Sequence, residues 1–168
     1  VGQVGNGTTS TRQMTPVQVS GLSGITAIAN GEYWFSLVLD SNGDVWAWGN
    51  NSYYQLGDGT GVSKTSPVKL TGVSNITAIE AGWGHAIALD SRGDLWGWGT
   101  NTNGQLGDGT ATNRISPVQI TGISGVSAIS TGYYISIAYK PDDSVWITGS
   151  NAYRRATVET GTYSFAEA

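Results

Sequence analysis

A repeat of about fifty residues constrains the fold of this chain more than any other feature. Its clearest marker is a tryptophan that recurs at Trp46, Trp96 and Trp146. The segment QLGDGT starts at Gln55 and again at Gln105, and the variant QVGNGT starts at Gln3. Motifs that recur in phase indicate tandem copies of one supersecondary unit. The three copies cover about 1–50, 51–100 and 101–151.

Each copy has the pattern of four short strands joined by turns. In the second copy we expect these strands at Pro67–Leu70, Ile76–Glu80, Ala86–Leu89 and Asp94–Trp98. The turn before the last strand contains Gly93, which can adopt the positive φ of a tight hairpin. Trp96 and Trp98 share one face of their strand and Leu95 lies on the other, so both faces are expected to be buried. The residues expected to build this repeated frame are Trp46, Trp48, Trp96, Trp98, Trp146, Gly57, Gly59, Gly107 and Gly109.

The composition argues against several classes of function. Charged residues make up 12% of the chain, against about 25% in an ordinary soluble domain. The net charge is −4 and the basic residues are scattered, so we expect no nucleic-acid partner. The absence of cysteine excludes disulfides and thiolate metal sites. No apolar run approaches the roughly 20 residues that a membrane span needs.

Several linked motifs carry a family resemblance. They are the ending W-x-W-G-x-N, the loop GQLGDGT, the turn S-P-V and the stretch A-G-x-x-H-x-x-A-L-D at 81–90. Over residues 1–151 the chain resembles the regulator of chromosome condensation repeats. The resemblance implies an all-β fold of three four-stranded antiparallel β-propeller blades, in a family whose members typically have seven. It implies a recognition surface but no particular activity, because one fold hosts many functions.

The third copy departs from the family pattern. Its second tryptophan is replaced by Thr148, and His85 of the second copy aligns with Phe35 and Ile135. After Asn151 the expected GQLGDGT is replaced by RRATVET, so we expect the repeat array to end there. No residue needed for nucleotide exchange can be matched to this chain.

Three blades do not close a ring, because propellers typically have four to eight. The end blades would leave apolar sheet faces in water. Three solutions stay open: the chain is part of a longer array, two copies form a six-bladed ring, or a partner completes the ring. In the tail at 152–168, Thr160–Ala166 alternates apolar and polar residues. This segment is either an extra strand at a sheet edge or a disordered end.

The candidate catalytic and metal-binding groups are better explained by structural roles. His85 is the only histidine and no nucleophile motif accompanies it. The run DSNGD at Asp40–Asp44 resembles the start of a calcium loop, but Asn51 stands where the closing glutamate would be. We expect these carboxylates to accept N–H bonds within a turn. The chain is therefore not expected to be an enzyme or to hold a metal or cofactor.

Aromatic residues gather in the loops between strands, where they would line one face of a propeller. Tyrosine and tryptophan are frequent in binding hot spots because they bury a large area at low entropic cost. Packing between blades is the alternative role for them. The candidate binding residues are Tyr33, Trp34, Tyr53, Tyr54, Trp83, Tyr133 and Tyr134.

We therefore expect a non-catalytic module that recognises a protein, or assembles with itself, through an aromatic-rich loop face. The resemblance implies two alternatives: a regulatory propeller acting on a small GTPase or chromatin, and an inhibitor of a secreted enzyme such as a β-lactamase. The partner is expected to be another protein or a second copy of the chain. The low charge and the many Ser, Thr and Asn residues favour an extracellular or cell-surface location in a bacterium or phage.

Overall fold

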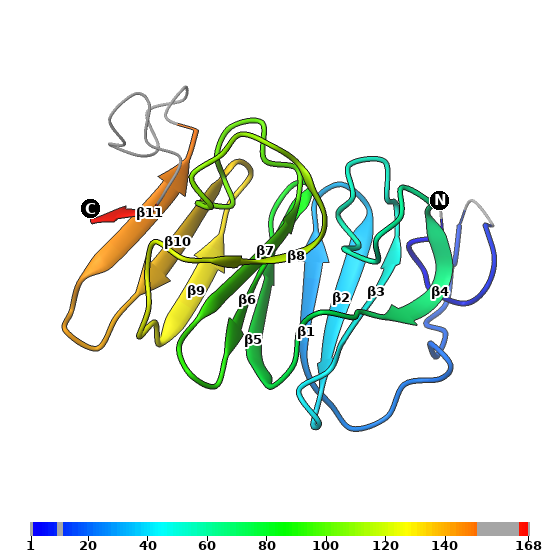
Figure 1. The fold of residues 1–168 in the computed structure, drawn as a ribbon. Helices are drawn as coiled ribbons and strands as arrows, with labels where there is room; N and C mark the ends of the chain where they lie inside the picture. Colours follow the sequence, from blue (N-terminus) through cyan, green and yellow to red (C-terminus); the bar gives the residue numbers. More distant parts are fainter. Residues whose placement is uncertain (1, 10–11, 151–164, 168) are drawn as a thin grey trace.

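The chain folds into short antiparallel strands, as its β-branched and aromatic residues favour. The computed structural model describes residues 2–9, 12–150 and 165–167. These residues form three sheets, which stand side by side in an open row (Figure 1). The described residues include no helix that is long and apolar enough to cross a membrane.

Each sheet follows the chain in order and all its pairings are antiparallel. Sheet 1 contains β1 (Ile25–Gly31), β2 (Phe35–Asp40), β3 (Val45–Gly49) and β4 (Lys64–Lys69). Sheet 2 contains β5 (Ile76–Ala81), β6 (His85–Asp90), β7 (Leu95–Gly99) and β8 (Arg114–Ile120). Sheet 3 contains β9 (Ala128–Thr131), β10 (Ile135–Tyr139), β11 (Val145–Gly149) and β12 (Ala166–Glu167). This arrangement confirms the expected all-β fold of four-stranded antiparallel sheets.

The sheets are out of phase with the copies seen in the sequence. The strand expected to begin the second copy is β4, and it pairs with β3 as the outer strand of sheet 1. Strands that follow each other along the chain usually lie side by side, which explains the shift. Pro67 is tolerated in β4 because this strand has a neighbour on one side only. The corresponding segment of the first copy, residues 15–20, forms no strand.

Two apolar cores lie between neighbouring sheets. The core between sheets 1 and 2 includes Phe35, Leu37, Leu39, Leu56, Ala88 and Trp98. The core between sheets 2 and 3 includes Ile87, Leu89, Leu95, Leu106, Ala138 and Phe165. Because side chains alternate, sheet 2 contributes one face to each core. The first strands of the sheets approach each other, since β1 contacts β5 and β5 contacts β9.

A tryptophan near the end of the third strand joins its sheet to a loop from earlier in the chain. In sheet 2 this is Trp98, and the loop is the one that follows β3 of sheet 1. Trp98 is buried, and its Nε1 donates to the Gln55 carbonyl oxygen at 3.0 Å. Gly57 lies against the indole with a φ of 69°, and a Cβ there would come within 2.6 Å of the ring. Only glycine fits this position comfortably. Trp48 takes the same position over Gly5.

Sheet 3 has Thr148 where this tryptophan would be. The Thr148 Oγ1 donates to the Gly104 carbonyl oxygen at 2.8 Å. Phe165 fills the remaining space and lies against Gly107. Directly after Phe165 comes β12, which pairs with β11. Most of the tail segment that was expected to be either an extra strand or a disordered end, 160–164, lies outside the described residues.

Candidate binding face

Three hairpin loops lie next to one another at one end of the sheets. They connect β1 to β2, β5 to β6 and β9 to β10. The Tyr33 N–H donates to the Trp83 carbonyl oxygen at 2.9 Å, and the Trp83 N–H donates to the Tyr133 carbonyl oxygen at 3.3 Å. These backbone bonds join the loops of successive sheets. The aromatic residues that the loops carry are thereby brought to one face.

The first of these loops is one residue longer than the second. Gly31 pairs with Phe35 across three residues, whereas the Gly82 N–H donates to the His85 carbonyl oxygen across two. Trp34 lies in the longer loop and has a φ of 62°. A positive φ is uncommon for a bulky residue and marks local strain.

Six of the seven predicted aromatic residues contact one another. Trp83 lies at the centre, with its ring centroid 4.5 Å from Tyr33, 4.9 Å from Tyr53 and 5.6 Å from Tyr133. Centroid distances of this size are typical of attractive aromatic pairs. Among the described residues, Tyr54 has no ring contact with this group. We call the group the aromatic ridge: Tyr33, Trp34, Tyr53, Trp83, Tyr133 and Tyr134.

The aromatic ridge is partly buried in its middle and open at its ends. Trp34 at one end is 54% exposed, and Tyr133 at the other is 41% exposed. Glu32 is the charged residue in the three hairpin loops. The ridge therefore presents rings, tyrosine hydroxyls and a single carboxylate to solvent, on loops that the strands hold in place.

Gln55 holds Tyr53 in the aromatic ridge. It is buried, its Oε1 accepts the Tyr53 N–H at 2.8 Å, and its Nε2 donates to the Tyr33 carbonyl oxygen at 3.3 Å. Gln105 is the counterpart of Gln55, and its Oε1 accepts the Asn103 N–H at 3.0 Å. Asn103 therefore stands where the first loop has Tyr53. The glutamine hydrogen bond therefore occurs in both loops, whereas the residue that it holds is aromatic only in the first loop.

His85 is buried beneath the β5–β6 loop, where a Cβ on Gly82 would clash with its ring. Its Nε2 lies 3.0 Å from Ser136 Oγ, and that hydroxyl donates to the Gln105 carbonyl oxygen at 2.7 Å. Because the hydroxyl proton is used there, Nε2 is the protonated nitrogen and donates to Ser136. Nδ1 has no hydrogen-bond partner among the described residues. Burial lowers the pKa of His85 to about 4, so the ring is neutral at pH 7.

The carboxylates that resemble a calcium loop belong to hairpin turns. Asp40 Oδ1 accepts the N–H groups of Asn42 at 2.9 Å and Asp44 at 3.1 Å. Asp40 Oδ2 accepts a bond from Trp46 Nε1 at 3.0 Å. The Trp46 bond is the main reason that the pKa of Asp40 lies below its usual value. Among the described residues, no three His, Asp or Glu side chains are placed to hold a metal ion.

The other residues of the predicted frame lie in turns and between sheets. Trp96 Nε1 lies 3.4 Å from Asp90 Oδ2, and Trp146 Nε1 donates to Ser144 Oγ at 2.9 Å. Both indoles therefore hold the turn that precedes their own strand. The loop glycines have φ values between 69° and 78°, which only glycine adopts easily, at Gly57, Gly59, Gly107 and Gly109.

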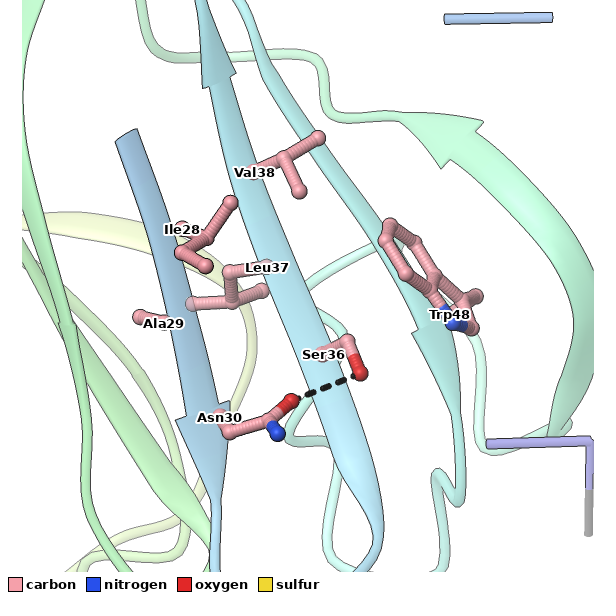
Figure 2. Close-up of a pocket in the computed structure, with 7 residues that line it drawn as sticks. All are labelled: Ile28, Ala29, Asn30, Ser36, Leu37, Val38 and Trp48. Atoms are coloured by element: carbon pink, nitrogen blue, oxygen red, sulfur yellow. Dashed lines mark hydrogen bonds between the residues drawn. The ribbon is translucent and has the colours of Figure 1, made fainter. Parts of the chain in front are cut away.

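The end sheets were expected to leave apolar faces in water, and the outer face of sheet 1 contains an apolar hollow that no motif of the sequence had marked as a site (Figure 2). The hollow is lined by Ile28, Ala29, Asn30, Ser36, Leu37, Val38 and Trp48. Ser36 Oγ donates to Asn30 Oδ1 at 2.9 Å beside it. The sequence signal for this hollow is the ITAI motif. Ile79 of that motif is buried in sheet 2, whereas its counterpart Ile28 has no sheet packed on it.

Comparison with known proteins identifies the repeat. The sequence profile of the Regulator of chromosome condensation (RCC1) repeat matches residues 42–89 and 92–139. A second profile with the same description matches residues 25–55 and 76–105. The matched segments cover more than half of the chain and fall on all three sheets.

Solved propellers share this fold. Yeast RCC1 (Prp20) in its complex with Kap60 is similar, with a TM-score of 0.75 and 22% identity over 88% of this chain and 37% of that one. Prp20p from Saccharomyces cerevisiae, described with its binding to Gsp1p and histones, gives 0.75 and 22% over 88% and 39%. Human WBSCR16 gives 0.71 and 20% over 85% and 37%. The chain thus spans about two fifths of the length of these proteins.

Proposed function

We propose that this chain, which belongs to the regulator of chromosome condensation (RCC1) repeat family, recognises a protein partner through its aromatic ridge. The observation that carries the proposal is the continuous ring contact from Trp34 to Tyr133, across loops of all three sheets. The fold supports a role as a protein-binding segment of a propeller. The aromatic ridge is our assignment of the surface that does the binding.

The physical argument is preorganisation. Rings already in contact, on loops joined by backbone hydrogen bonds, lose little conformational freedom when a partner binds. Tyrosine and tryptophan bury large areas while fixing only two torsions each. Trp34 holds a strained positive φ, and strain of this kind is concentrated at functional sites. The exposed Trp34 and Tyr133 are the residues expected to contribute most to affinity.

Recognition without catalysis agrees with the chemistry around the aromatic ridge. His85 is the only imidazole, and it is buried in the interface between sheets 2 and 3. A pKa of about 4 leaves the ring neutral at pH 7, and its complete burial keeps it away from anything bound at the surface. The Asp40 and Asp90 carboxylates are occupied by turn N–H and indole groups.

The candidate partner classes can be separated by direct binding. Gsp1p and histones are the ligands named for yeast Prp20p, and a secreted β-lactamase represents the inhibitor alternative. Accelerated nucleotide release from Gsp1p would identify the exchange alternative, whereas binding without release would favour simple recognition. All three probes are proteins, so the same surface argument applies to each.

The test measures the affinity of the purified chain for Gsp1p, core histones and a β-lactamase by biolayer interferometry. We expect at least one probe to bind, and the double variant Trp34→Ala/Tyr133→Ala to bind it about tenfold or more weakly. Tyr54→Ala is the matched control, because Tyr54 is a loop tyrosine outside the aromatic ridge, and it should leave the affinity unchanged. Binding that survives the double substitution, or no binding to any probe, contradicts the proposal.

A further inference from the structure

The middle of the aromatic ridge has a neighbouring sheet on both sides. Trp83 belongs to the β5–β6 loop of sheet 2, and its ring contacts Tyr33 of sheet 1 and Tyr133 of sheet 3. Trp83 is only half-buried between them, so part of the indole stays open to solvent. The surroundings of this ring are therefore set by all three sheets.

Two acidic residues lie next to the Trp83 loop. Glu32 is exposed, and its N–H donates to the carbonyl oxygen of Gly82, the residue before Trp83, at 3.2 Å. Glu80 lies on β5 two residues before Gly82 and is half-buried. Because alternate residues of a strand share a face, Glu80 lies on the same face as Ala78, which packs in the core between sheets 2 and 3. One acidic residue therefore lies on each side of this loop.

The other carboxylates whose side chains the structure describes are already bound within the chain. Those with a lysine or arginine within ion-pair distance are Asp44, Asp58, Asp90, Asp94, Asp108 and Asp142. Asp40 and Asp143 accept hydrogen bonds instead. Within the described part of the chain, the carboxylates of Glu32 and Glu80 have neither kind of partner.

The aromatic ridge has negative groups and no positive ones. Neither the three hairpin loops nor the loop at 50–63, which carries Tyr53, contains a lysine or arginine. Burial raises the pKa of Glu80, because its carboxylate loses water and gains no positive neighbour. The faces of aromatic rings are also negative and attract cations, those of tryptophan most strongly. A ligand cation would therefore meet carboxylates and ring faces here without competition from the chain's own basic residues.

We propose that the aromatic ridge binds a basic segment of its protein partner, with an arginine or lysine side chain on the Trp83 indole and Glu32 as its counter-charge. This inference rests on the proposed function, because it names the chemistry of the partner at the same surface. The methylene stem of such a side chain packs on the neighbouring tyrosine rings while its charged end stays near the carboxylate. The net charge of −4 favours the approach of a basic partner over an acidic one.

The test uses three peptides of equal length that differ only at four positions, which hold arginine, glutamine or glutamate. Their affinities for the purified chain are measured by biolayer interferometry at low and high salt. We expect the arginine peptide to bind about tenfold more tightly than the glutamine peptide, and the glutamate peptide not to bind. High salt should weaken the arginine peptide, since exposed charges are screened.

Two matched charge variants locate the counter-charge. Glu32→Gln should weaken the arginine peptide about threefold, as the loss of one exposed ion pair does. Asp143→Asn removes the same charge from the turn between β10 and β11, at the opposite end of β10 from the aromatic ridge, and should leave the affinity unchanged. Asparagine suits this position, because Asp143 has a φ of 67° and asparagine tolerates a positive φ. Equal losses in the two variants would show that only net charge matters and would overturn the proposal.

A second pair of variants tests the role of the indole face. Trp83→Phe keeps a ring face and should retain part of the affinity for the arginine peptide, whereas Trp83→Leu keeps only apolar area and should lose about fivefold or more. Circular dichroism checks that both variants fold. Equal affinities of the two variants overturn the proposal, as does an arginine peptide that binds no more tightly than the glutamine peptide. A protein probe that still depends on Trp34 and Tyr133 in that case leaves the proposed function standing.

Discussion

Phe165 lies over Gly107 in the position that Trp98 takes over Gly57. A Cβ on Gly107 would come within 2.7 Å of Phe165 Cδ2, and one on Gly57 within 2.6 Å of Trp98 Cδ1. Thr148 is too small to fill this position itself. A residue that follows the three copies in the sequence therefore completes the packing of the third sheet.

Phe165→Ala should destabilise the chain strongly. Phe165 is buried in the core between sheets 2 and 3, so its truncation leaves a cavity. We expect the free energy of unfolding, measured with guanidinium chloride, to fall by about 3 kcal/mol. Met14→Ala, at a position that is 85% exposed, should change it by less than about 0.5 kcal/mol. A loss at Phe165 as small as that of the control would mean that Phe165 does not belong to the core.

A double-mutant cycle tests whether Phe165 replaces the missing tryptophan. Thr148→Trp alone should cost about 1–3 kcal/mol, because the site is already filled. In the Phe165→Ala background the same substitution should instead raise the free energy of unfolding, since the indole then enters the vacated space. The coupling between the two changes should exceed about 1 kcal/mol. Additive effects would contradict the shared site.

His85 should make the stability depend on pH in mildly acidic solution. Its pKa is about 4 in the folded chain, against about 6.5 when unfolded. As the pH falls, the unfolded chain takes up the proton first, so stability is lost between about pH 6.5 and 4 and changes little from this group below pH 4. The loss is on the order of 3 kcal/mol. His85→Gln should remove this part of the pH dependence of unfolding; an unchanged slope would contradict the buried neutral ring.

Asn101→Ala should unravel the loop that contains Asp108. Asn101 is buried, its Oδ1 accepts the Leu106 N–H at 2.9 Å, and its Nδ2 donates to Asp108 Oδ1 at 2.9 Å. Its removal leaves the buried Leu106 N–H unpaired, which costs about 1–3 kcal/mol in the free energy of unfolding. Asn103→Ala in the same loop should cost far less, because the backbone of Asn103 makes the bond to Gln105. Equal losses in chemical denaturation would contradict this assignment.

The strands and their repetition could be predicted from the sequence, because alternating apolar residues and turn glycines are local signals. The grouping of strands into sheets could not. The strand at Lys64–Lys69 begins the second copy by the spacing of the internal repeat, yet its hydrogen bonds go to β3. A period shows how often a unit recurs, but it does not show where one sheet ends and the next begins.

The residues of the aromatic ridge could be named as candidates from the sequence, but their contacts with one another could not be predicted. Trp83 meets Tyr53 only because Gln55 and the β3–β4 loop bring that ring across from another part of the chain. Phe165 could not have been assigned, since it reaches Gly107 over a long sequence separation and no local pattern records the contact. Thr148 indicated a gap in the repeat, and the structure shows what fills it.

Hydroxyl-radical footprinting tests the central claim, that the aromatic ridge is the contact surface, most directly. The chain is oxidised alone and in complex with the probe protein that it binds most tightly. We predict that the oxidation rates of Trp34 and Tyr133 fall several-fold in the complex, while Met14, which is exposed and lies outside the three hairpin loops, reacts at an unchanged rate. Equal oxidation of Trp34 and Tyr133 in the free and bound chain would contradict the claim.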